Sequence, residues 1–173
     1  MSEPRDILEA LHLDRIYFLK WTTFVVSGKE KEHDFVPDRL IYQRRYEYEE
    51  SKTILSKYLY ELGGRLQIGS HNIILPPGVN IDTTTLTNLN LANYPVRSKK
   101  QLEKKVIIGT LNNLAIYPRS QGIGYHQMYI YDEIIKSGWL TDSSLKKFSL
   151  YYAVRDNGLK IKLLYKPLKI SFC

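Results

Sequence analysis

The sequence predicts an α+β fold, with an antiparallel β-sheet packed against two or three helices and a C-terminal β-hairpin. Three patterns support this class. Residues 15–26 are almost all β-branched or aromatic, as in a buried strand. Apolar residues between 54 and 62 follow helical spacing up to the pair Gly63-Gly64, a common helix stop. Near the C-terminus, Asn157-Gly158 separates two strand-like segments and is a strong hairpin signal.

Length and composition indicate one globular domain over residues 1–173. The chain is 43% hydrophobic and 25% charged, which argues against disorder. The acidic N-terminus lacks the apolar region of a signal peptide, and no apolar run approaches the roughly 20 residues that span a bilayer. We therefore expect a protein that is not secreted and has no transmembrane segment. The single cysteine, Cys173, excludes a disulfide framework and a multi-cysteine zinc site.

The first half of the chain is predicted to begin with a short helix, residues 3–11 within the segment 1–12. After the strand at 15–26, residues 39–48 alternate in polarity and predict a second strand. Residues 49–62 predict a helix, and residues 65–75 predict a hairpin that turns near Gly69-Ser70 and ends before Pro76-Pro77.

The second half opens with a long segment, residues 76–103, which is rich in Thr and Asn and lacks strong periodicity. We expect it to be a long, mobile loop. Residues 104–117 predict a strand pair, or one strand with a bulge at Gly109. Residues 125–137 predict a helix. The C-terminal hairpin is expected from residues 148–155 and 159–165, followed by a last strand at 168–172.

Charge is distributed unevenly along the chain. Residues 1–50 hold 8 basic and 11 acidic residues, whereas residues 97–173 hold 14 basic and 5 acidic residues. A basic half of this kind attracts RNA, DNA or anionic lipid headgroups. The simpler alternative is that the lysines protect sheet edges from aggregation. The predicted polyanion-binding residues are Arg97, Lys99, Lys100, Lys104, Lys105, Lys146, Lys147, Arg155, Lys160, Lys162, Lys166 and Lys169.

Motifs for catalysis are weak. The four histidines have no metal-ligand spacing, and His126 is interpreted as a packing or surface residue. Asp82 with Glu103-Lys104-Lys105 matches the Asp and Glu-x-Lys pattern of metal-dependent nucleases. In a lysine-rich chain, a solvated charge cluster is the simpler interpretation. We therefore predict no catalytic residue, metal site, cofactor or small-molecule substrate, and expect a protein that is not an enzyme.

The chain also resembles the matrix proteins of rhabdoviruses. The segments carrying the resemblance are IGTLNNLAIY, YHQMYIYDEIIKSG, WLTDSSLKK, FSLYYAVRDNGLKIKLLY and LKISF, in the order strand, helix, link, hairpin and strand. The match is best over residues 104–173, while RIYFLKWTTFVVSG is similar to the aromatic opening strand of that family. The late-budding motifs P-P-x-Y and P-T-A-P are absent. The resemblance therefore implies a short member, of the kind found in viruses that infect plants or insects.

That resemblance implies a structural protein of the virion and host cytoplasm. Its partners would be a viral nucleocapsid or RNA, an anionic membrane surface, and other copies of itself. The charge asymmetry independently supports self-association, because the acidic N-terminal part of one copy can meet the basic part of the next. We expect Ile7, Leu8 and Leu11 on the N-terminal helix to mediate it, unless that helix packs on its own core.

Two other functions stay open from the sequence. One is a small nucleic-acid-binding protein that regulates or counters host processes, and the other is the metal-dependent nuclease described above. Salt-sensitive polymers would favour the matrix-type function over the first. Magnesium-dependent cutting that is lost in Asp82→Ala would identify the second.

Overall fold

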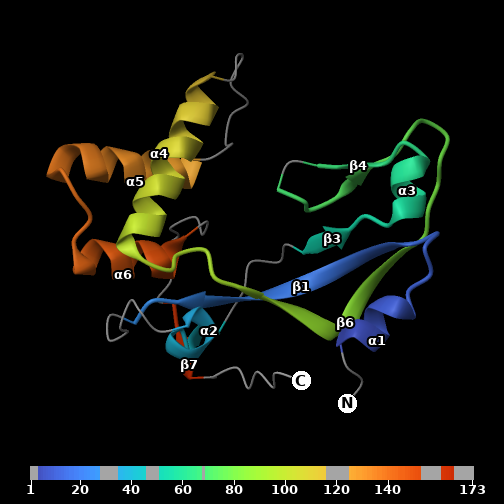
Figure 1. The fold of residues 1–173 in the computed structure, drawn as a ribbon, viewed down its shortest axis with the longest axis horizontal. Coiled ribbons are helices and arrows are strands. Elements are labelled where there is room, and N and C mark those ends of the chain that lie inside the picture. The colour runs from blue at the N-terminus through green and yellow to red at the C-terminus, as the bar shows by residue number, and fades with distance from the viewer. Residues whose placement is uncertain are drawn as a thin grey trace. The chain divides into compact units, whose positions relative to one another are not determined.

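A computed structural model of the chain describes residues 4–27, 35–45, 51–67, 69–115, 125–152 and 161–165 (Figure 1). The chain divides into two compact units, which are unit 1 (Met1–Thr22 and Glu47–Asn93) and unit 2 (Thr23–Tyr46 and Tyr94–Cys173). Strand β1 (Ile16–Val25) contributes to both. Helices combine with antiparallel strand pairs, so the predicted α+β class is confirmed.

Unit 1 is built around the first seven residues of β1. Its other elements are α1 (Pro4–Glu9), β3 (Lys52–Ile54), α3 (Lys57–Glu61), β4 (Arg65–Leu66), β5 (Ile73–Ile74) and β6 (Thr83–Asn93). Strand β3 pairs antiparallel with β1, with Phe18 opposite Thr53, and β6 also pairs with β1. Buried Ile16 packs with Leu59 on one side of β1, while Tyr17 packs with Leu86 on the other. Both faces of β1 are therefore covered over much of its length, which explains why most of its residues are apolar.

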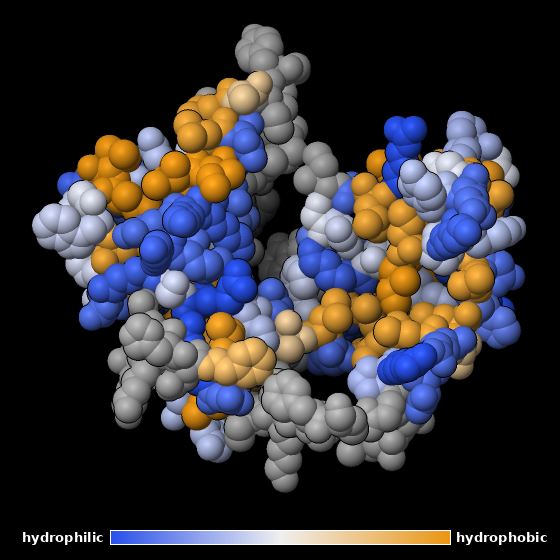
Figure 2. All heavy atoms as spheres, viewed as in Figure 1, coloured by the Kyte–Doolittle hydropathy of each residue, from blue (hydrophilic) through white to orange (hydrophobic). Residues whose placement is uncertain are grey.

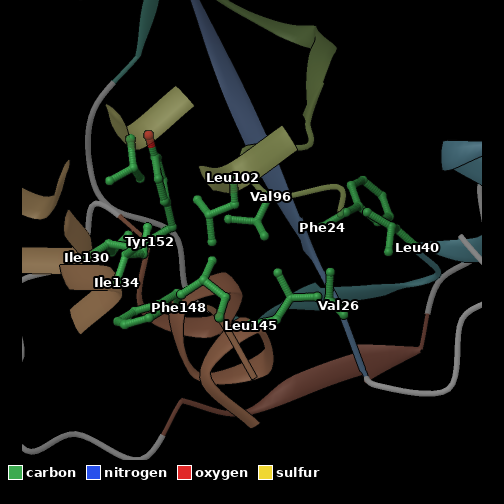
Figure 3. Close-up of a cluster of buried hydrophobic side chains, with 12 residues drawn as sticks. Phe24, Val26, Leu40, Val96, Leu102, Ile130, Ile134, Leu145, Phe148 and Tyr152 are labelled. Carbon is green, nitrogen blue, oxygen red and sulfur yellow. The ribbon is translucent and has the colours of Figure 1, made fainter. Parts of the chain in front are cut away.

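Unit 2 combines the end of β1 with a helical layer. Its other elements are α2 (Val36–Arg39), β2 (Tyr42–Arg44), α4 (Lys99–Ala115), α5 (Tyr125–Ser137), α6 (Asp142–Tyr151) and β7 (Leu163–Tyr165). Strand β2 pairs antiparallel with β1 and with β7. Figure 3 shows one core, in which Phe24 and Leu40 lie on one side, Ile130 and Phe148 from α5 and α6 on the other, and Leu102 from α4 between them.

The segment predicted as strand at 104–117 is helical as far as Ala115, so that prediction is wrong. A capping box starts α4: the Gln101 amide donates to Ser98 Oγ at 3.2 Å, and the Arg97 amide donates to Gln101 Oε1 at 3.0 Å. Leu102 and Val106 are then fully buried one turn apart. Burial of this helical face outweighs the β-propensity of the Val-Ile-Ile run.

Gly109 permits a close helix approach in place of the predicted bulge. A Cβ atom at this position would clash with the side-chain amide of Gln127 on α5. The glycine therefore lets the Gln127 side chain lie directly against the backbone of α4.

The loop predicted over residues 76–103 is also wrong over much of its length. Residues 83–93 form β6, and α4 begins at Lys99. Threonine favours strands because its β-branched side chain fits a pleated surface. Leu86 supplies the buried anchor against Tyr17 and Leu19. Most residues of β6 are polar and exposed, so the sequence has no apolar run that would indicate a strand.

The C-terminal prediction is only partly matched. Residues 148–151 end helix α6, so the first strand of the predicted hairpin is wrong there. Thr141 Oγ1 caps α6 by accepting from the Ser144 amide at 3.0 Å, and Phe148 and Ser149 are buried. Strand β7 lies inside the predicted second strand and pairs with β2. The Asn157-Gly158 turn and the strand at 168–172 lie outside the described residues.

Helix α5 has the bounds predicted from the sequence, and several other predicted elements are present with shorter bounds. Helix α1 replaces residues 3–11, and β4 and β5 form the hairpin predicted at 65–75. Residues 69 and 70 both have positive φ angles at that turn. The helix predicted at 49–62 is wrong at Lys52–Ile54, which form strand β3, and α3 begins only at Lys57, where the Ser56 hydroxyl accepts from the Leu59 amide.

The two faces of α4 give a direct stability prediction. We expect Leu102→Ala to destabilise unit 2 by about 2–5 kcal/mol, because it opens a cavity beneath a fully buried side chain. Ile108→Ala, on the same helix at 59% exposure, should change stability by less than about 0.5 kcal/mol. Urea unfolding followed by circular dichroism measures both. Equal effects of the two variants would contradict the orientation of α4.

Candidate polyanion-binding surface

The residues of both predicted basic clusters belong to unit 2. Arg97 lies just before α4, the lysines at 99, 100, 104 and 105 lie in its first two turns, and Lys146 and Lys147 lie on α6. Lys162 is exposed just before β7. The other predicted residues lie outside the part of the chain that the structure describes; these are Arg155, Lys160, Lys166 and Lys169.

Three contacts hold the start of α4 beside α6. Lys99 Nζ lies 2.6 Å from Asp142 Oδ1 at the first residue of α6. Glu103 Oε1 accepts from the Leu140 amide at 3.2 Å. Lys105 Nζ lies 4.4 Å from the ring centroid of Tyr152, directly after α6. Basic residues far apart in the sequence therefore lie on two neighbouring helices.

The predicted cations differ in how they face solvent. Lys105 is half-buried, and its Nζ donates to the Pro95 carbonyl oxygen at 3.3 Å. Burial lowers the pKa of Lys105, and the nearby Arg97 charge lowers it further. Lys147 Nζ donates to the Tyr129 hydroxyl at 3.1 Å, and Lys99 pairs with Asp142. The predicted cations with exposed side chains in this region include Arg97, Lys100, Lys104 and Lys146.

The rings of His126 and Tyr152 pack against each other next to Lys105. The His126 and Tyr152 rings meet edge to face, with centroids 4.7 Å apart. Burial lowers the pKa of His126 to about 4, and the Lys105 charge acts in the same direction. Burial raises the pKa of Tyr152 to about 12, although a hydrogen bond with Gln127 opposes the shift. Both rings are therefore neutral at pH 7, which supports the interpretation of His126 as a packing residue.

The solvent face of α4 holds residues that the sequence analysis missed. After Lys100 and Lys104, four aliphatic side chains are 40–59% exposed. We call them the α4 apolar stripe, and they are Ile107, Ile108, Leu111 and Leu114. Recognising the capping box at Ser98 would have indicated a helix, and helical spacing would then have placed the stripe on the face opposite Leu102 and Val106.

The predicted self-association residues, of which Ile7 and Leu8 lie on α1 and Leu11 just after it, have different environments. Leu11 packs against the Tyr17, Leu19 and Leu86 cluster of its own unit, Ile7 is half-buried, and Leu8 is 46% exposed. Part of the apolar face predicted for residues 3–11 is therefore used within the chain. Self-association through the remainder stays a prediction.

The residues of the nuclease pattern make other contacts. Asp82 Oδ2 lies 3.9 Å from Arg15 Nη2 in unit 1, whereas Glu103 accepts the Leu140 amide in unit 2. Within the described ranges, no group of three or more His, Cys, Asp or Glu side chains is placed to hold a metal ion. The described geometry therefore adds no support to this pattern.

Comparison with family models, curated protein sequences and solved structures finds no match to this chain. None of the helices in the described part combines the length and hydropathy needed to cross a bilayer.

The environment of His126 predicts acid sensitivity. Its pKa is about 4 when folded and about 6.5 when unfolded, so the unfolded state binds more protons between these values. Its contribution to stability is therefore complete above pH 6.5 and falls as the pH drops toward 4. We expect a loss of about 1–3 kcal/mol for unit 2 over this range.

Urea unfolding at a series of pH values tests this expectation. His126→Gln should flatten the decline, whereas His12→Gln, at an exposed position, should keep the wild-type pH dependence. The same slope in both variants would assign the acid sensitivity to other groups.

Proposed function

We propose that this chain is a non-enzymatic structural protein of the viral matrix type, which binds anionic surfaces and associates with copies of itself. The observation that carries the proposal is the division of charge between the two units. Unit 1 has 6 basic and 9 acidic residues, and unit 2 has 19 basic and 9 acidic residues. Their net charges are therefore −3 and +10, so each unit attracts a different kind of partner.

Polyanion binding is assigned to the start of α4 together with α6. Glu103, the one acidic residue of α4, is half-buried and accepts the Leu140 amide, so the exposed charges on α4 are positive. The N-terminal end of the helix dipole adds positive potential. Lys100 and Lys104 face solvent one turn apart, where phosphates of RNA or lipid headgroups can reach them.

Self-association is assigned to contact between unit 1 of one copy and unit 2 of the next. Opposite net charges favour this head-to-tail arrangement, whereas two +10 units repel each other. A heterologous contact of this kind generates open polymers unless its rotation closes a ring. Such polymers suit a protein that coats a nucleocapsid beneath a membrane.

Viral identity rests on the sequence resemblance. Helix α5 lies where the resemblance expects a helix, whereas residues 104–115 and 148–151 are helical where it expects strands. We keep as part of the proposal a short matrix protein of a plant- or insect-infecting rhabdovirus, present in the virion and at membranes in the host cytoplasm. The basic surface would equally serve a small nucleic-acid-binding regulator, and self-association distinguishes the two.

Charge reversal on α4 tests polyanion binding. We expect Lys100→Glu/Lys104→Glu to weaken binding to single-stranded RNA and to phosphatidylserine vesicles. For RNA, the slope of log affinity against log salt should fall by roughly 1.4, which is about 0.7 for each lost phosphate contact. Fluorescence anisotropy and vesicle sedimentation measure the two affinities.

The matched control is Lys20→Glu/Lys57→Glu, which reverses two exposed lysines of unit 1. This control should retain most of the binding, because the total charge changes equally but the α4 surface stays intact. Equal losses in both double variants would show that net charge alone drives binding.

Light scattering at low and high salt tests self-association. We expect polymers at low salt that dissolve at high salt, because salt screens the attraction between the units. Leu8→Ser should lower association and leave folding unchanged, since Leu8 is exposed on α1. A single small species under all conditions would favour the nucleic-acid-binding regulator, and undiminished association of Leu8→Ser would remove α1 from the interface.

A further inference from the structure

The solvent face of α4 has a basic half and an apolar half. Lys100 and Lys104 occupy its first part, and the α4 apolar stripe follows on the same side of the helix. Spacings of three and four residues relate Lys104, Ile107, Leu111 and Leu114, so these side chains form one row. The opposite side is anchored by Leu102 and Val106, both fully buried.

The α4 apolar stripe brings four exposed aliphatic side chains together on one helix face, whereas exposed apolar residues are usually scattered singly. Ile108 and Leu111 are 59% and 55% exposed, and Ile107 and Leu114 are 40% and 47% exposed. Figure 2 shows hydrophobic side chains gathered over the upper part of α4 and over α5, with hydrophilic side chains over the lower part of α4. Contiguous aliphatic surface of this kind marks an interaction site.

We propose that this face of α4 docks onto an anionic lipid surface. The helix would lie in the plane of the membrane, with the apolar stripe at the boundary of the acyl chains and Lys100 and Lys104 on headgroup phosphates. The lysine stems can extend toward the phosphates while their methylene groups cover apolar surface. This inference rests on the proposed binding of anionic surfaces and names lipid, rather than RNA, as the partner of α4.

The chemistry of the face favours lipid over RNA. Single-stranded RNA is bound by cations on its phosphates and by aromatic rings stacked on its bases. Helix α4 contains no aromatic residue, and RNA offers no apolar layer for four aliphatic side chains. An acyl-chain boundary satisfies both halves of the face at once.

A second copy of the chain is a less suitable partner for this face of α4. Two α4 faces packed in parallel would bring the Lys100 and Lys104 charges of both copies together. Any contact between unit 2 of one copy and unit 2 of another would also bring together two units that each have a net charge of +10. An anionic lipid surface supplies the opposite charge at the lysines and an apolar phase at the stripe.

Paired variants of the full chain test the proposal. We expect Ile108→Ser/Leu111→Ser to weaken binding to phosphatidylcholine–phosphatidylserine vesicles about tenfold or more, while affinity for single-stranded RNA stays within about twofold. Lys100→Glu/Lys104→Glu should weaken both. The matched control, Leu62→Ser/Ile74→Ser, removes two exposed aliphatic side chains of unit 1 and should leave both affinities unchanged.

A direct insertion measurement keeps the test independent of variant folding. In Cys173→Ser, a single cysteine at Ile108 carries an environment-sensitive dye, and its emission should shift to the blue with these vesicles but not with RNA. The same dye at Lys146→Cys, on exposed α6, is the comparison site and should shift less.

Three outcomes would overturn the inference. Wild-type vesicle binding by Ile108→Ser/Leu111→Ser, with loss of both affinities in Lys100→Glu/Lys104→Glu, would leave the proposed function standing without lipid docking by the stripe. Equal loss of RNA and vesicle binding in the serine variant would remove the preference for lipid. Reduced self-association with unchanged vesicle binding would identify a second copy as the occupant. Unchanged binding in the charge-reversal variant would instead contradict the proposed function itself.

Discussion

The architecture of unit 2 depends on the burial of one face of α4. Leu102 and Val106 enter the core from this face and meet side chains of α5 and α6. The side chains of a straight helix have fixed directions about its axis, so anchoring two of them determines where all the others point. The ion pair of Lys99 with Asp142 and the Leu140 amide on Glu103 hold the same orientation from the neighbouring segment.

That orientation divides the basic residues of α4 into different roles. Lys105 turns toward the interior, where Pro95 and the Tyr152 ring receive its ammonium group, and burial lowers its pKa. Lys100 and Lys104 turn to solvent. Neighbouring lysines in the sequence thus differ in role: Lys105 is a packing residue, whereas Lys100 and Lys104 are exposed and form part of the proposed binding surface. A count of charges along the chain cannot separate them, because the distinction is set by the helical period and by the position of the core.

Charge is also divided at the level of the two units. Strand β1 contributes to both units, and the chain leaves and re-enters unit 1 before it completes unit 2. The acidic segments at residues 1–22 and 47–50 thereby join one unit, and the basic C-terminal half joins the other. The proposed head-to-tail association and the proposed lipid docking use different parts of this distribution. Both can operate at once when unit 1 of the next copy contacts a part of unit 2 other than the exposed face of α4.

Several properties were determined by the sequence alone. These are the α+β class, the long apolar strand, the helix at 125–137, the hairpin at 65–75 and the segregation of charge. Each depends on a local pattern strong enough to outweigh its surroundings, such as a continuous β-branched run or a glycine-bounded turn. The tertiary structure decided the remainder, where propensity differences below about 1 kcal/mol opposed the burial of whole side chains worth about 1.5–3 kcal/mol each.

Helices α4 and α6 show that balance most clearly. Val-Ile-Ile in α4 and Phe-Ser-Leu-Tyr at the end of α6 both favour strands locally, yet each lies in a helix because Val106 and Phe148 are buried in the core of unit 2. Strand β6 shows the converse, since one buried leucine and its pairing with β1 organise a polar segment. The proposed binding surface could not be predicted from the sequence for the same reason. Its lysines and aliphatic side chains share a face only because the core of unit 2 takes the opposite side of α4.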